Sequence, residues 1–314
     1  MHRTLVWSLG LVLSAHPLLG QDAAPPPVAG RWDLTVIGTD GRRMPSWLEI
    51  HWSGDRVLVG RFVGVVGSVR PISRLTFSHD TLRFSLPPQW EGGDGDFQIM
   101  GVFAADTFAG SLTTPDGKQL AWSGHRAPAL QRATAPQWGA PQKLFNGTDL
   151  TGWHAVGGDN QWKAVGGVLT NARRGANLVT DGTYRDFKLH LEFRYPKDGN
   201  SGVYLRGRYE AQVEDSVVTS GSAEATGGLG AIYGFLMPNQ NAAKGADEWQ
   251  SYDITLVGRI VTVVLNGREV ICRTTIPGIT GGALDSDEGA PGPIMLQGDH
   301  GPVEYRNVTI TLAR

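Results

Sequence analysis

The segment NSGVYLRGRYEAQVED, from Asn200 to Asp215, decides the fold of this chain of 314 residues, because its apolar and polar side chains alternate. Successive side chains of a β-strand point to opposite faces of the sheet, so this alternation predicts strands. Tyr204 and Arg206 share one face of the first strand, and Glu210 and Gln212 share one face of the second. A buried charge without a partner costs several kcal/mol. We therefore expect these polar side chains to line a cleft, with a solvent-facing sheet surface as the alternative.

The same alternation marks further strands in the C-terminal half of the chain. They are expected at Asp186–Tyr195, Gly202–Arg208, Ala211–Glu214, Gln250–Val257, Ile260–Leu265 and Val303–Leu312. No segment longer than about ten residues shows helical periodicity. Two glycine-rich connections, Val217–Asp247 and Ile276–Pro293, are longer than the usual ~4 to 6 residues, which is typical of the rims of functional sites.

The N-terminal half is also predicted to be all-β. Short alternating segments at Trp47–Trp52, Arg56–Phe62 and Thr81–Leu86 are separated by glycine-containing turns. A barrel or a small sandwich would pair the edges of such strands. Alanine and proline are frequent at residues 128–141, which favours a linker. We predict a smaller barrel-like domain at 28–127, a linker at 128–141 and a second β-domain at 142–314.

The N-terminus indicates export. His2 and Arg3 precede the apolar run Leu5–Leu13, which is too short to span a bilayer, so residues 1–24 are predicted to be a signal peptide, with a membrane anchor as the alternative. The expected location is periplasmic or extracellular, with no membrane partner after removal of the signal. A single cysteine, Cys272, excludes a disulfide framework. The net charge of −2, without a basic cluster, argues against nucleic acid as a partner and favours a neutral ligand.

A second group of polar residues lies between Pro293 and Val308. It contains Gln297, Asp299, His300 and Arg306 close to the start of a predicted strand. His300 is the best candidate for acid–base chemistry, because the ordinary imidazole pKa of ~6.5 suits proton transfer at neutral pH. Its alternative role is to stabilise a turn.

The motifs of the C-terminal half resemble the 3-keto-disaccharide hydrolase family, whose members are also described as 3-keto-glucoside 1,2-lyase and 3-keto-2-hydroxyglucal hydratase domains. The matching segments are Leu144–Trp153, Trp162–Leu169, Tyr184–Phe187, Glu192–Arg194, Asn200–Gly202, Tyr209–Gln212, Asp215, Gly230–Tyr233, Glu248–Trp249, Leu265–Gly267, Leu296–Gln297, His300–Gly301 and Arg306–Val308. Two departures are Gln250, where Asn commonly follows the Glu-Trp pair, and Gly298-Asp299, which lengthen the spacing between Gln297 and His300. The resemblance implies a concanavalin A-like β-sandwich, or jelly roll, with a sugar cleft on its concave face.

The resemblance also implies a chemistry. A ketone at C3 acidifies the C2 hydrogen of the sugar, so a base can remove it, the C1 substituent can leave, and water can then add to the enone. His300 would act as the base and Glu210 or Asp215 as the acid, and Arg206 with Gln212 would stabilise the enolate. The expected substrate-binding residues are Asn200, Tyr204, Gln212, Tyr233, Trp249, Gln297 and Arg306. The implied partner is a small carbohydrate; no oxidising cofactor is required, and a divalent metal ion is left open.

Two other functions are compatible with the same residues. An ordinary glycoside hydrolase would use two carboxylates on the Glu210–Asp215 strand, although Gln212 stands where such glucanases usually carry a carboxylate. A noncatalytic carbohydrate-binding protein would use Trp249, Tyr204 and Tyr233 as its sugar platform. The sequence leaves open the anomer, the aglycone, the oligomeric state and the role of the N-terminal domain.

Overall fold

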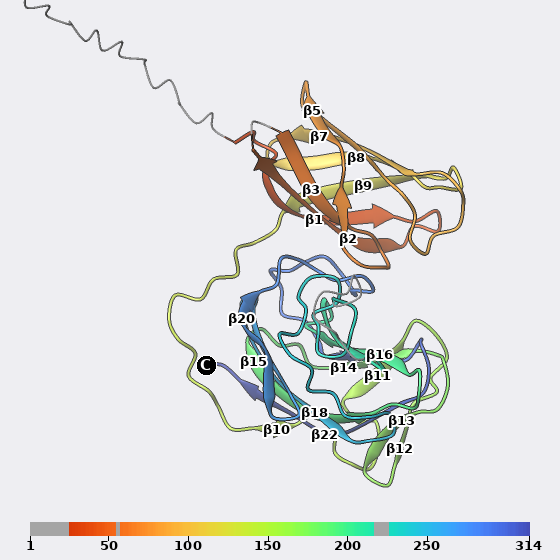
Figure 1. Cartoon of the computed structure of the whole chain (residues 1–314), viewed down its shortest axis with the longest axis vertical. Coiled ribbons are helices and arrows are strands. Elements are labelled where there is room, and N and C mark those ends of the chain that lie inside the picture. Colours follow the sequence, from red (N-terminus) through yellow and green to blue (C-terminus); the bar gives the residue numbers. More distant parts are fainter. Residues whose placement is uncertain (1–24, 55–56, 217–225) are drawn as a thin grey trace, which may run out of the picture.

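The computed structural model describes residues 25–54, 57–216 and 226–314, which contain strands and turns but no helix. Two all-β units follow one another along the chain (Figure 1), and residues 127–141 between them contain no regular strand. The predicted signal peptide at 1–24 lies outside the described residues. Within the described ranges, no helix is long and apolar enough to cross a membrane.

The N-terminal unit is one antiparallel sheet of nine strands that curls into a nearly closed barrel. Its order is β4-β3-β2-β1-β9-β8-β7-β6-β5, and β3 lies beside β5. Inside it, Trp32 packs edge to face on Phe108, with ring centroids 4.5 Å apart, and the Arg126 guanidinium covers Trp32. The strands are β1 (Gly30–Ile37), β2 (Arg43–Ser53), β3 (Val57–Val63), β4 (Arg70–Ile72), β5 (Leu75–Ser78), β6 (Thr81–Leu86), β7 (Phe97–Ala104), β8 (Thr107–Thr113) and β9 (Gln119–Arg126).

The C-terminal unit is a sandwich of two antiparallel sheets. The larger sheet has the order β12-β13-β22-β15-β18-β19-β20, with β10 beside β22, and the five-stranded sheet has the order β11-β14-β21-β16-β17. Its strands are β10 (Gln142–Lys143), β11 (Trp153–Val156), β12 (Lys163–Val165), β13 (Val168–Asn171), β14 (Asn177–Thr180), β15 (Phe187–Arg194), β16 (Asn200–Leu205), β17 (Tyr209–Glu214), β18 (Gln250–Val257), β19 (Ile260–Leu265), β20 (Arg268–Thr275), β21 (Met295–Leu296) and β22 (Val303–Leu312).

Alternation along β16 and β17 separates the core of the sandwich from its outer face. Val203, Leu205 and Ala211 are buried between the two sheets, where Ser201 Oγ lies 2.8 Å from the hydroxyl of Tyr305 on the opposite sheet. The residues that alternate with them along the two strands, such as Tyr204 and Glu210, face the outer side of the five-stranded sheet. The predicted fold class, an all-β chain with a smaller barrel-like domain ahead of a β-sandwich, is confirmed.

The barrel packs on the two long connections of the sandwich. Trp47 of β2 is fully buried there, with its ring 5.5 Å from that of Phe235. A Cβ at Gly278 would lie 2.2 Å from the Trp47 indole, so only glycine leaves room for this contact. The Gly282 amide also donates to the Val65 carbonyl, at 3.0 Å. The barrel therefore covers the connections that border the five-stranded sheet.

Candidate active site

The outer face of the five-stranded sheet carries a buried carboxyl group, that of Glu210. In the register of β16 and β17, Glu210 pairs with Tyr204, and Gln212 pairs with Gly202. A Cβ at Gly202 would lie 2.2 Å from Glu210 Oε1, so the glycine makes space for the carboxyl group. Glu210, Tyr204 and Gln212 are each less than a tenth exposed. The alternation predicted from sequence thus brings these three side chains together on one face.

Burial changes the charge of Glu210. Loss of hydration raises its pKa to about 8. The polar contact with the Tyr204 side chain lowers this pKa, while the negative charges of Asp299 and Glu214 raise it further. Burial also raises the pKa of Tyr204 well above 10, and its hydroxyl donates to the Gly281 carbonyl at 2.9 Å. At neutral pH, Glu210 is therefore a protonated acid that can give a proton away.

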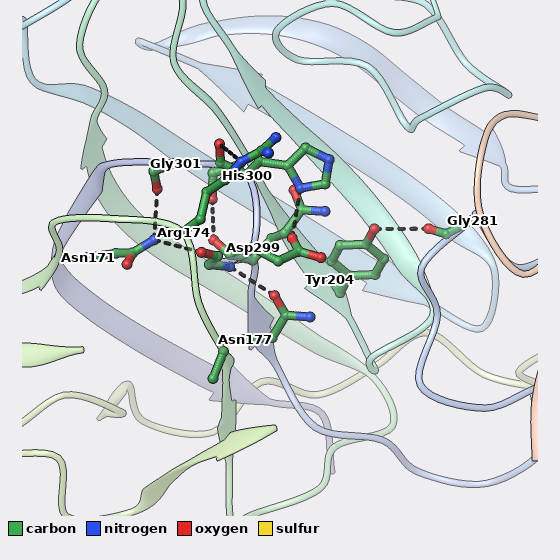
Figure 2. Close-up of polar contacts among 12 residues, drawn as sticks. Asn171, Arg174, Asn177, Tyr204, Gly281, Asp299, His300 and Gly301 are labelled. Atoms are coloured by element: carbon green, nitrogen blue, oxygen red, sulfur yellow. Dashed lines mark hydrogen bonds and ion pairs between the residues drawn. The ribbon is translucent and has the colours of Figure 1, made fainter. Parts of the chain in front are cut away.

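The second polar group, Gln297 to His300, joins the same face. The Gln297 amide nitrogen donates to the Gly202 carbonyl at 2.9 Å. Its side-chain Oε1 is buried without a hydrogen-bond partner among the residues described. His300 Nδ1 lies 2.7 Å from Asp299 Oδ1, and both side chains are about half exposed. Figure 2 shows the Asp299–His300 pair beside Tyr204, in agreement with the effect of Asp299 on the pKa of Tyr204 and Glu210.

Side chains distant in sequence hold the loop that carries His300. Asn171 Nδ2 donates to the carbonyls of Gly298 and Gly301, at 3.1 and 2.7 Å. Arg174 Nε donates to the His300 carbonyl at 3.1 Å, and Asn177 accepts from the Gly298 amide at 2.9 Å (Figure 2). Asn171, Arg174 and Asn177 were not predicted from the sequence. Only the loop contacts of the folded chain identify these three residues. Asp299 belongs to the polar group predicted from the sequence, but no role was assigned to it there; the structure shows it beside His300 Nδ1.

Tyr233 and Asn200 border the same face. The backbone amide of Tyr233 donates to the Glu210 carbonyl at 3.0 Å. Burial raises the pKa of the Tyr233 hydroxyl, and the nearby charge of Glu210 raises it further. Asn200 starts β16 on the side of Tyr204 and pairs in register with Glu214. Both residues that were predicted to bind substrate therefore lie on the face that carries Glu210.

Arg206 is the main correction to the predicted site. The strand expected to reach Arg208 ends at Leu205, and Arg206 and Gly207 adopt positive φ angles of 54° and 65° in the turn that follows. The turn breaks the alternation. The Arg206 guanidinium therefore lies 5.2 Å from the ring of Tyr209, a core-side residue, and donates to the Gly258 carbonyl. Its charge is not on the face of Glu210.

Trp249 and Arg306 lie on the other sheet. Arg306 is stacked over the Trp249 ring at 3.9 Å and donates to Glu192, which faces outward from β15. The prediction that they border the site is contradicted, because the sandwich core separates the outer faces of its two sheets. Asp215 is also occupied elsewhere: its carboxylate accepts from the Asp198 amide at 2.9 Å and closes the turn before β16.

The donor groups do not form a metal-binding cluster in the described part of the chain: no group of three or more His, Cys, Asp or Glu side chains could hold an ion there. The residues brought together are a carboxyl group with a raised pKa, a histidine–carboxylate pair, three side-chain amides and two phenols. Such a set can move protons and bind sugar hydroxyls.

Comparisons with known proteins bear on the same domain. The profile of the 3-keto-alpha-glucoside-1,2-lyase-like domain matches residues 140–311. A proposed glycosyl hydrolase from Parabacteroides distasonis is 29% identical, with 57% of this chain and 92% of that chain covered and a TM-score of 0.47. Another from the same organism is 26% identical, with 55% and 98% covered and a TM-score of 0.44. A carbohydrate-binding module of Bacillus subtilis is 16% identical, with 52% and 96% covered and a TM-score of 0.36. No curated protein matches the sequence.

Proposed function

Because the chain belongs to the family of 3-keto-alpha-glucoside-1,2-lyase-like domains, we propose that it cleaves 3-keto-glucosides and 3-keto-disaccharides on the outer face of the five-stranded sheet. The observation that carries the proposal is the buried carboxyl group of Glu210, whose pKa is raised to about 8 and which lies within electrostatic reach of Asp299, the partner of His300. An acid and a base with separate environments are what elimination next to a ketone requires.

His300 is proposed to start the reaction. When its Nδ1–H donates to Asp299, the lone pair of Nε2 faces away from that bond and can accept the C2 proton. The electron pair of the C2–H bond forms the enolate, whose negative charge collects on the C3 oxygen. The Gln212 side-chain oxygen already accepts from the Val213 amide, so its NH₂ group is the part that can donate to this oxygen. Gln297 supplies a second amide.

Glu210 is proposed to complete the elimination. The enolate electrons form the C1–C2 double bond, the C1–O bond breaks, and Glu210 transfers its proton to the departing oxygen. Water then adds its oxygen to C1 and a proton to C2. The sum of the two steps is hydrolysis of the glycosidic bond with no change in oxidation state, so no redox cofactor takes part. The apolar N-terminal run leads us to propose that this reaction occurs outside the cytoplasm.

The reaction can be tested in D₂O with the full chain and 3-keto-trehalose as substrate. Elimination followed by hydration places deuterium at C2 of the released 3-keto sugar, above the level of an enzyme-free sample, and produces a transient enone. Release without deuterium at C2, or equal cleavage of unmodified trehalose, would instead indicate an ordinary glycoside hydrolase. Saturable binding without release would indicate a noncatalytic carbohydrate-binding protein.

A further inference from the structure

The N-terminal barrel contains a cavity of about 430 Å³ at the end formed by the β1–β2, β3–β4, β6–β7 and β8–β9 connections. Its walls are mainly apolar and include Val36, Met44, Phe62, Phe97, Leu112 and Leu120. Cavities of ~300 to 1,000 Å³ with apolar walls and few polar groups are typical of small-molecule sites. None of the steps proposed for the sandwich uses this cavity.

A buried cation, Arg70, lies in the wall of the cavity. Arg70, at the start of β4, is only 4% exposed, and its guanidinium lies 5.7 and 5.3 Å from the rings of Phe62 and Phe97. Nη1 donates to the Pro87 carbonyl at 2.9 Å, while Nε has no hydrogen-bond partner within the described ranges. A buried guanidinium that is incompletely hydrogen-bonded is costly, and an anionic oxygen would remove that cost.

The other charges around the cavity are already satisfied. Asp40 pairs with Arg42, and Asp116 pairs with Lys118 at 2.7 Å, each within one exposed turn. Glu91 meets Arg70 at a long N–O distance of 3.5 Å. Its other oxygen accepts from the backbone amides of Gln89 and Trp90, at 2.8 and 3.1 Å. Among the cations of the wall, Arg70 is therefore the buried one, and its Nε has no hydrogen-bond partner within the described ranges.

We propose that this cavity is a second binding site, for a small molecule with an apolar ring or chain and one carboxylate. The carboxylate pairs with Arg70 in place of Glu91, which its own loop amides continue to hold. The apolar part fills the space between Met44, Phe97 and Leu120. The site is separate from the sugar site, so its ligand binds whether or not the sandwich is catalytic.

Calorimetry with the full chain tests the proposal, with trans-cinnamate as the probe and cinnamyl alcohol as its uncharged analogue. Cinnamate is expected to bind about tenfold or more tightly than the alcohol, because a charge-assisted hydrogen bond is about twice as strong as a neutral one. Arg70→Gln should remove this preference. Met44→Trp, which reduces the volume of the cavity and leaves Arg70 in the sequence, should abolish binding of both probes. Val102→Thr, at a half-exposed position on β7, is the matched control and should leave binding unchanged.

Three results would overturn the proposal: no binding of either probe, equal binding of acid and alcohol, or binding that survives Met44→Trp. Near-UV circular dichroism checks the fold of each variant. If Arg70→Gln does not fold, Met44→Trp and the acid–alcohol comparison still decide the outcome.

Discussion

Asp33 of β1 and Glu288, from the connection between β20 and β21, form a buried carboxyl pair where the barrel meets the sandwich. Both are fully buried. The Tyr209 hydroxyl donates to Glu288 Oε1 at 2.8 Å, and Arg31 Nη1 lies 3.9 Å from Oε2. Burial, and then the charge of Glu288, raise the pKa of Asp33 to about 9, and burial raises the pKa of Glu288 as well. The pair therefore holds at least one proton at neutral pH.

This proton makes stability depend on pH. In the unfolded chain Asp33 titrates near 3.8, so between about pH 4 and 9 the folded state binds one proton more than the unfolded state. The free energy of unfolding must then fall as pH rises, by ~1.4 kcal/mol per pH unit for one proton. From pH 5 to 8 the pair accounts for a loss of about 4 kcal/mol.

The double substitution Asp33→Asn with Glu288→Gln keeps the shape of the pair and removes its titration. Urea unfolding of both proteins, followed by tryptophan fluorescence at pH 5, 6, 7 and 8, should show a slope against pH that is flatter in the variant by at least ~1.4 kcal/mol per pH unit. Asp40→Asn is the control: hydrogen bonds from Arg42 lower the pKa of Asp40, so it is ionised in both states across this range. Parallel curves for the wild type and the double variant would refute the reasoning.

Four further outcomes are expected. Glu210→Gln and His300→Ala should each lower the rate on a 3-keto-glucoside about a hundredfold or more. His190→Ala, which removes an equivalent histidine–carboxylate pair on the other sheet, should leave that rate unchanged. Since Glu210 with a pKa of about 8 must be protonated to act as an acid, kcat/KM should fall as pH rises through about 8, and a flat alkaline limb would argue against this role. Trp249→Ala should not change KM, because the Trp249 ring lies on the other sheet; a raised KM would mean that Trp249 does contact the substrate. Trp47→Ala should lower stability by about 3 to 5 kcal/mol in urea unfolding, and a loss below ~1 kcal/mol would mean that the barrel is not anchored through this residue.

Local sequence was sufficient where the chain is a regular strand. The period of two follows from strand geometry alone, so it correctly separated Val203 and Leu205 from Tyr204 on β16. It likewise put Glu210 and Gln212 on one face of β17. The same argument failed at Arg206, because a turn with positive φ follows Leu205 and alternation ends with the strand.

What the sequence determined by itself is therefore the all-β class and the face to which each strand residue belongs, since both depend on neighbours a few positions away. Only the tertiary structure decided which faces meet. It put Trp249 on the opposite sheet from Glu210 and brought Asp299 and His300 toward Glu210 through a loop held by Asn171. It also buried Asp33 of the barrel against Glu288 of the sandwich. These outcomes depend on the order of the strands and on how the layers stack. Both are determined by contacts between residues far apart in the chain, so a local sequence pattern does not contain them.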